Sequence, residues 1–305
     1  MNSKKANRLF LSVILMHFVL IALLMVSSQF FSLGIIESLL VSQMVIFLPA
    51  LISLLFSKEK VKVRDLGFRK IKISTVFLVA LYTLLCLPLV TLVNTISMLF
   101  VDNTVVSMSG EILSVPFPVA FGMIALLGPV SEEFVFRGVV FNGYRKDGNL
   151  LGAIILSAST FSLMHMNFNQ AGYAFVIGIA LAFAMVATNS IWSSIIMHII
   201  INAQSVVIMF LSEYLVPGSL EAEAVSITKE DLLMTIGIYS IIAAVTTVLA
   251  ICLLIFIANR EGQKEILGKI IEKPENSKCR VTASLITAFI IAFLYMLWEV
   301  VLTTV

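Results

Sequence analysis

The sequence has little charge. Asp, Glu, Lys and Arg make up 12% of its 305 residues, whereas 60% are hydrophobic and the mean hydropathy is +1.06. A soluble globular chain is about 25% charged and about 45–50% apolar. The composition therefore excludes a soluble globular domain, a disordered chain and a basic nucleic-acid-binding protein, and a net charge of +2 gives no sign of a nucleic-acid partner. It is typical of a protein embedded in a lipid bilayer.

Other absences narrow the class further. The three cysteines, Cys86, Cys252 and Cys279, imply no disulfide framework, because two lie in apolar runs and one in a basic loop. There is no His-Glu-x-x-His motif and no P-loop, which disfavours a site-2-type metalloprotease and excludes an ATPase. No Asp lies in the middle of an apolar run, and no Gly-x-Ser-x motif is paired with a later His. An aspartyl intramembrane protease and a rhomboid are therefore disfavoured.

Long apolar segments predict the fold. A transmembrane helix needs about 20 mostly apolar residues. We expect an all-α, polytopic transmembrane helix bundle of about nine spans, or eight, forming a single integral membrane domain over residues 1–305. The predicted spans cover residues 9–31, 35–56, 73–100, 116–143, 149–168, 171–189, 190–211, 232–258 and 282–304.

The basic residues predict the orientation. Lys and Arg favour cytoplasmic loops. If the spans alternate, 18 of the 20 basic residues fall on one side: before span 1, after spans 2 and 4, and between spans 8 and 9. The loops on the other side hold acidic residues and only one basic residue, Lys229. The acidic residues are Asp102, Glu111, Glu213, Glu221, Glu223, Glu230 and Asp231. We therefore expect a cytoplasmic N-terminus and a C-terminus on the opposite side.

Three charged residues stand inside the fourth span. Glu132, Glu133 and Arg137 each cost about 2.5–3.5 kcal/mol at bilayer depth on insertion scales. Glu133 and Arg137 are four residues apart, so they lie on one helix face and can pair. Glu132 is turned about 100° away from Glu133 and has no local partner. It must face another helix, water or a substrate.

Two of the three histidines complete a polar set. His165 lies near the end of the fifth span, one turn after Phe161, and His198 lies in the seventh span with Asn202 one turn later. We expect these residues to converge with Glu132 on one wet pocket, although His165 lies about 10 Å along the axis from the middle of its predicted span. The third histidine, His17, has no polar neighbour at helical spacing and is interpreted as a residue that hydrogen-bonds between helices.

The chemistry of this set is hydrolysis. A carboxylate can take a proton from water, neutral imidazoles can assist that transfer, and an amide or imidazole N–H can donate to an oxyanion. Two His and one Glu (here Glu132, His165 and His198) can alternatively bind a catalytic zinc ion with one position left for water. The residue types leave both mechanisms open.

The residues resemble the three motifs of the CPBP family, which contains CAAX prenyl proteases and bacteriocin-processing (Abi) enzymes. The motifs are Glu132-Glu133-x-x-x-Arg137, Phe161-x-x-x-His165 and His198-x-x-x-Asn202, within a core over residues 116–211. The segments 65–69 and 189–192 also resemble the family. The resemblance implies a membrane endopeptidase in which Glu132 and His165 activate water and His198 and Asn202 stabilise the oxyanion. Glu133, Arg137 and Phe161 would support the site, and a divalent metal such as zinc stays open.

Two other functions compete with the protease. One is a non-catalytic immunity or regulatory protein that binds a peptide or a partner in the membrane. The other is an ion-coupled transporter, because intramembrane Glu and His also form proton relays, but inverted repeats are not evident. The complete hydrolytic set favours an enzyme with a membrane-associated peptide or protein substrate. Its short loops are typical of a bacterial member, so we expect it in the bacterial plasma membrane.

Overall fold

The computed structural model describes residues 2–27, 33–57, 61–218, 227–272 and 280–304, and the regular structure in these ranges is helical. Cys279 lies outside the described residues. So do six charged loop residues on which the predicted orientation depends: Lys58, Lys60, Glu221, Glu223, Lys273 and Lys278. Eight helical segments of the described chain are long and apolar enough to cross a membrane, which confirms a polytopic helical bundle. They are α1 (Ser3–Ser27), α2 (Ile35–Leu55), α3 (Ile73–Ser97), the stretch Phe117–Arg145, α10 (Phe168–Thr188), α11 (Ile191–Leu215), α13 (Lys229–Arg260) and α15 (Ala283–Thr304).

The fifth predicted span is shorter than expected. Helix α9 runs only from Leu150 to Met164, 15 residues or about 22 Å, against a hydrocarbon core of about 30 Å. It ends because Met166 adopts a left-handed backbone (φ 58°) and the Asn167 side chain caps α10. His165 is therefore the residue that caps α9 rather than one buried inside a longer span. The predicted boundary at 168 was wrong. His165 is still displaced from the middle of its helix, because it lies eight residues, or about 12 Å, beyond the central residue Ser157.

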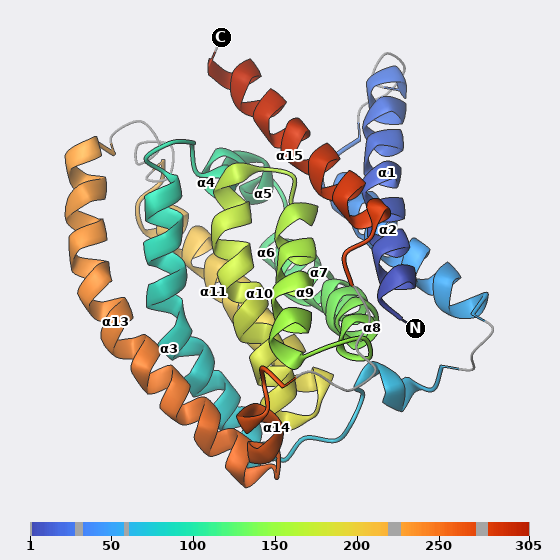
Figure 1. Ribbon diagram of the computed structural model, residues 1–305. Coiled ribbons are helices and arrows are strands. Elements are labelled where there is room, and N and C mark those ends of the chain that lie inside the picture. The colour runs from blue at the N-terminus through green and yellow to red at the C-terminus, as the bar shows by residue number, and fades with distance from the viewer. Residues whose placement is uncertain (1, 28–32, 58–60, 219–226, 273–279, 305) are drawn as a thin grey trace.

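The chain nevertheless changes side across this short helix. At its start, Leu151 N–H donates to Ile270 O (2.9 Å), next to the helix α14 (Lys264–Gly268). Beyond its end, the Asn169 amide donates to Asn94 Oδ1 (2.9 Å), near the end of α3. Figure 1 shows α14 and the end of α3 at opposite ends of the bundle. Successive helices thus still run between the two ends of the bundle in alternating directions, and α9 is the short helix of this series.

The fourth span is a helix interrupted twice. It consists of α6 (Phe117–Ala120), the π-helical segment η2 (Phe121–Leu127), α7 (Gly128–Glu133), the π-helical segment η3 (Phe134–Phe141) and α8 (Asn142–Arg145). Side chains of neighbouring residues satisfy carbonyls of the π segments: Ser157 Oγ donates to Phe136 O (3.0 Å), and Asn142 Nδ2 donates to Gly138 O (3.0 Å). Such π segments are frequent at functional sites, and these two flank Glu132 and Glu133.

The interrupted span lies in the middle of the molecule. In Figure 1, α3 and α13 form one flank, α1, α2 and α15 form the other, and α7, α9, α10 and α11 lie between them. Helices α9 and α10 approach closely because Gly178 faces Ala158, where an added Cβ would lie 3.0 Å from the alanine. The remaining short helices are η1 (Val63–Leu66), α4 (Thr104–Ser107) and α5 (Ser109–Leu113).

The two outlying segments of the family resemblance lie against each other. Ile191 N–H donates to Gly67 O (2.9 Å), and Ser190 Oγ donates to Arg69 O (2.6 Å). Gly67 has φ 92°, a left-handed conformation that favours glycine. These contacts fix the start of α11, the helix that carries His198 and Asn202.

Candidate active site

A fully buried ion pair anchors the site. Arg137 Nη1 lies 3.0 Å from Glu133 Oε1, as the four-residue spacing predicts, and both side chains are 0% exposed. Arg137 Nη2 also donates to Gly178 O on α10 (3.1 Å), and the guanidinium carbon lies 4.3 Å from the centroid of the Phe161 ring on α9. Arg137 therefore joins three helical segments through a carboxylate, a carbonyl and an aromatic face.

His198 lies between the two glutamates. Its Nδ1 is 3.1 Å from Glu133 Oε1, and its Nε2 is 3.9 Å from Glu132 Oε2. The side chain is almost completely buried, so Glu133 fixes the orientation of the imidazole and directs Nε2 toward Glu132. This is the arrangement of an orienting carboxylate behind a histidine.

His165 is oriented by the backbone of its own helix. Its Nδ1 lies 2.9 Å from Phe161 O. Because a carbonyl oxygen can only accept a hydrogen bond, Nδ1 carries the proton and the neutral ring keeps its lone pair on Nε2. The Phe161 ring meets His165 and His198 edge to face, with centroid distances of 5.1 and 5.7 Å. Phe161 thus holds both imidazoles and the Arg137 guanidinium around one aromatic ring.

Asn202 is held by the first π segment. Its Nδ2 donates to Ile124 O in η2 (3.0 Å). An amide nitrogen has two N–H groups, so one donor remains for another acceptor. The interruption of the helix at η2 therefore fixes the asparagine that follows His198 by one turn.

One cavity joins the predicted catalytic residues. It has a volume of about 370 Å³, and its walls include Glu132, His165, His198 and Asn202. The expected convergence of three helical segments on one pocket is therefore present in the structure. The remaining wall comes mainly from α3, α10 and α11 and mixes apolar with polar side chains. The apolar ones include Leu87, Val90, Ile177, Ile201 and Met209, and the polar ones include Thr91, Asn94, Gln204 and Ser205. We call this space the main cavity.

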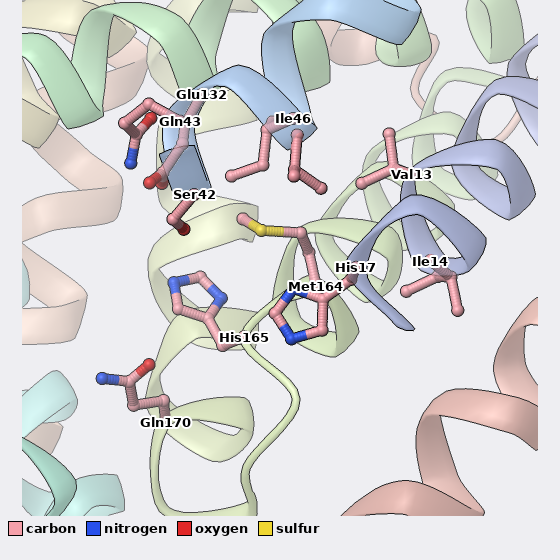
Figure 2. A pocket seen from close by; sticks show the side chains of 11 residues that line it. Val13, Ile14, His17, Ser42, Gln43, Ile46, Glu132, Met164, His165 and Gln170 are labelled. Atoms are coloured by element: carbon pink, nitrogen blue, oxygen red, sulfur yellow. The ribbon is translucent and has the colours of Figure 1, made fainter. Parts of the chain in front are cut away.

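A second, smaller cavity of about 170 Å³ lies against the same residues on the side of α1 and α2. It shares Glu132, His165 and Gln170 with the main cavity and adds His17, Ser42 and Gln43 (Figure 2). We call it the side cavity. Gln43 is fixed in turn by a hydrogen bond from the Ser131 hydroxyl, next to Glu132 in the chain.

The sequence analysis did not predict that His17, Ser42 and Gln43 belong to the site. His17 was interpreted as a residue between helices, yet it points from α1 toward His165 (Figure 2). A usable signal was present in the second span, where the polar pair Ser42 and Gln43 stands near the middle of an apolar helix. Polar residues at that depth mark sites by default.

The metal alternative gains no support from the geometry. Within the described part of the chain, no three His, Cys, Asp or Glu side chains are grouped so that they could hold a metal ion. His198 directs one nitrogen to Glu133, and His165 directs one to its own helix backbone. Glu132, His165 and His198 share a cavity but are not placed as a three-ligand set.

Comparison with known proteins finds a family and a curated relative that part of this chain resembles. Residues 114–204, which contain all three motifs, match the family described as Rce1-like, type II CAAX prenyl endopeptidase. The curated "Putative membrane peptidase YdiL" of Bacillus subtilis (strain 168) is 30% identical over 87 residues, which cover 28% of this chain and 35% of that protein. The match thus spans about a third of the length of this relative, and no solved structure matches the chain. The motifs, the matched family and this relative together support the recognition of the chain as a CPBP-family (CAAX protease) protein.

Proposed function

We propose that this protein is a membrane-embedded endopeptidase that hydrolyses a peptide bond in a membrane-associated peptide or protein. The observation that carries the proposal is the main cavity, where Glu132 and His165 meet His198 and Asn202. A general base, a second proton acceptor and two oxyanion donors are the groups that amide hydrolysis needs. Walls that mix apolar and polar side chains suit a peptide segment, which has both apolar side chains and polar amide groups.

In the proposed reaction, Glu132 takes one proton from a water molecule as the water oxygen attacks the scissile carbonyl carbon. The π electrons of the carbonyl move to its oxygen, which accepts hydrogen bonds from His198 Nε2–H and Asn202 Nδ2–H. The C–N bond then breaks as the proton held by Glu132 passes through His165 Nε2 to the leaving amine. No step requires a metal.

The charges around His198 support its role as a donor. Glu132, Glu133 and Arg137 together leave one excess negative charge. His198 faces this charge on both sides, with Nδ1 3.1 Å from Glu133 and Nε2 3.9 Å from Glu132, and the oxyanion role requires a hydrogen on Nε2. Glu133 is then the positioning residue that holds this imidazole, and Arg137 balances Glu133.

The proposal extends to the setting of the enzyme. Eight helices suited to a bilayer, short connections and a bacterial relative support a multi-pass protein of a bacterial plasma membrane. A peptide substrate would enter the main cavity from the membrane or its surface.

The test is cleavage of a mixed peptide library by the purified protein in lipid nanodiscs, run in H₂¹⁸O and analysed by mass spectrometry. We expect new C-termini that carry ¹⁸O. We expect Glu132→Gln to lower their rate of formation by about 10²–10⁴-fold, the usual contribution of a positioned acid or base. Glu111→Gln, an exposed carboxylate on α5, is the matched control and should cleave normally. If the unmodified protein forms no ¹⁸O-labelled C-termini, the proposal is wrong and a non-catalytic binding function takes its place. If Glu132→Gln retains the full rate, the role given to Glu132 is wrong.

A further inference from the structure

The two cavities divide the proposed site unequally. Glu132 and His165 line both, whereas His198 and Asn202 line only the main cavity. The proposed oxyanion donors therefore face the main cavity alone, and the carbonyl of a substrate must lie there. The residues proposed to accept protons from water are reachable from the opposite side as well.

The side cavity has the size and lining of a space for water. At about 30 Å³ for each molecule in the liquid, its 170 Å³ holds roughly five waters. A pocket that receives a drug-sized ligand is larger, about 300 Å³ or more. Water in a protein interior needs two to four polar partners. The side cavity offers six polar side chains: His17, Ser42, Gln43, Glu132, His165 and Gln170.

We propose that the side cavity is a water chamber that supplies the attacking water to Glu132 and His165, and that His17 is a positioning residue for that water. This inference rests on the proposed function for its catalytic consequence. His17 extends from α1 toward His165 (Figure 2), so a water between the two imidazoles can be held within reach of His165 Nε2. Gln43, held by Ser131, bounds the chamber beside Glu132.

The arrangement answers a physical need of hydrolysis inside a membrane. A peptide segment that fills the main cavity displaces water from the face of Glu132 that it covers. A separate chamber behind Glu132 and His165 keeps water at these residues while the substrate is bound. Substrate and water then reach the reacting atoms from opposite sides.

The experiment is radiolytic hydroxyl-radical footprinting of the full protein in lipid nanodiscs, in which side chains next to bound water are oxidised fastest. Met164 lines the side cavity, and Met44, on the lipid-exposed face of α2, is the internal reference. We expect Met164 to be oxidised at least several-fold faster than Met44. His17→Phe and Ser42→Val should each lower the oxidation of Met164, while the lipid-facing Val19→Phe on α1 should not.

The second arm measures cleavage of a peptide identified in the library. We expect His17→Phe to lower kcat by about 10–100-fold with KM unchanged, because misplaced water slows the chemical step without weakening substrate binding. Oxidation of Met164 no faster than that of Met44 would overturn the chamber. So would an effect of His17→Phe on KM alone, which would make the side cavity a subsite for the substrate. Because footprinting needs no cleavage, absence of protease activity overturns the proposed function while leaving the water content of the chamber measurable.

Discussion

At the scale of single residues, the site depends on side chains that already use one polar atom in a hydrogen bond within the protein. His165 uses Nδ1 for its own helix, His198 uses Nδ1 for Glu133, and Asn202 uses one N–H for Ile124. Each imidazole therefore has Nε2 left for the main cavity, and Asn202 has one N–H and its carbonyl oxygen left. A site fixed in this way requires little reorganisation when a substrate binds, which is the condition for strong electrostatic stabilisation of a developing oxyanion.

Replacement of the amide tests the oxyanion role. We expect Asn202→Leu to lower kcat by about 10²–10³-fold with little change in KM, because the lost donor acts mainly on the tetrahedral oxyanion. Steady-state kinetics on a library-derived peptide measure both constants. A rise in KM at constant kcat would instead make Asn202 a substrate-binding residue.

The buried ion pair predicts a stability effect. Glu133→Gln removes one charge and leaves Arg137 uncompensated at 0% exposure, which typically costs about 3–5 kcal/mol. We expect a marked fall in the unfolding midpoint in detergent. The double variant Glu133→Gln/Arg137→Met should recover part of the loss, since no buried charge of the pair is then left unmatched. If the loss in the double variant equals the sum of the losses in Glu133→Gln and Arg137→Met, the two residues are not coupled.

At the scale of elements, the interruptions of the helices place the site. The two π segments flank the glutamates, and the early end of α9 at Met164 places His165 in the cavity. None of this follows from hydrophobic periodicity, which counts apolar residues but does not detect a change of helical pitch or a left-handed residue such as Met166. The sequence could predict which side chains meet, from their rarity and their spacing, but not how the helices bend to bring them together.

The contact between α9 and α10 is testable through its glycine. Gly178→Ala places a Cβ 3.0 Å from Ala158 and 3.3 Å from a ring carbon of Phe161, so the two helices must separate. We expect a loss of about 1–3 kcal/mol, typical of overpacking, together with lower activity because Phe161 contacts both imidazoles. Gly237→Ala on α13 is the control, since its Cβ would meet nothing within 4 Å. Equal thermal unfolding midpoints for the two variants would show that the close approach is not required.

At the scale of the whole molecule, the charge distribution predicts the orientation in the membrane. The described basic connections, including 61–72 and 260–272, contact or lie near the end of the bundle where α13 ends, and the end of α15 lies at the other (Figure 1). We expect the N-terminus in the cytoplasm and the C-terminus outside it. Alkaline phosphatase fused to the C-terminus should be active and a fluorescent protein fused there dark, whereas fusions to the N-terminus should behave in the opposite way. Matching results at both termini would contradict the alternation.

The packing of the whole bundle also explains why the residues that line only the side cavity were not predicted from the sequence. Two ranges far from the motifs, the first and second spans, bring His17, Ser42 and Gln43 to the residues of the fourth and fifth. No local spacing links these positions, because only the packing of α1 and α2 against the interrupted span places them together. The motif residues were identifiable because their spacing is local to single helices.

The central claim is that Glu132 and His165 act as one unit on the same water. The most direct measurement is kcat/KM for Glu132→Gln, His165→Gln and the double variant on one cleaved peptide, with folding confirmed by thermal unfolding. Groups that act together in one step show strongly non-additive losses. We predict that each single variant loses nearly all activity and that the double variant is no slower than the worse of the two. Losses that multiply, or a single variant with the activity of the unmodified protein, would contradict the account.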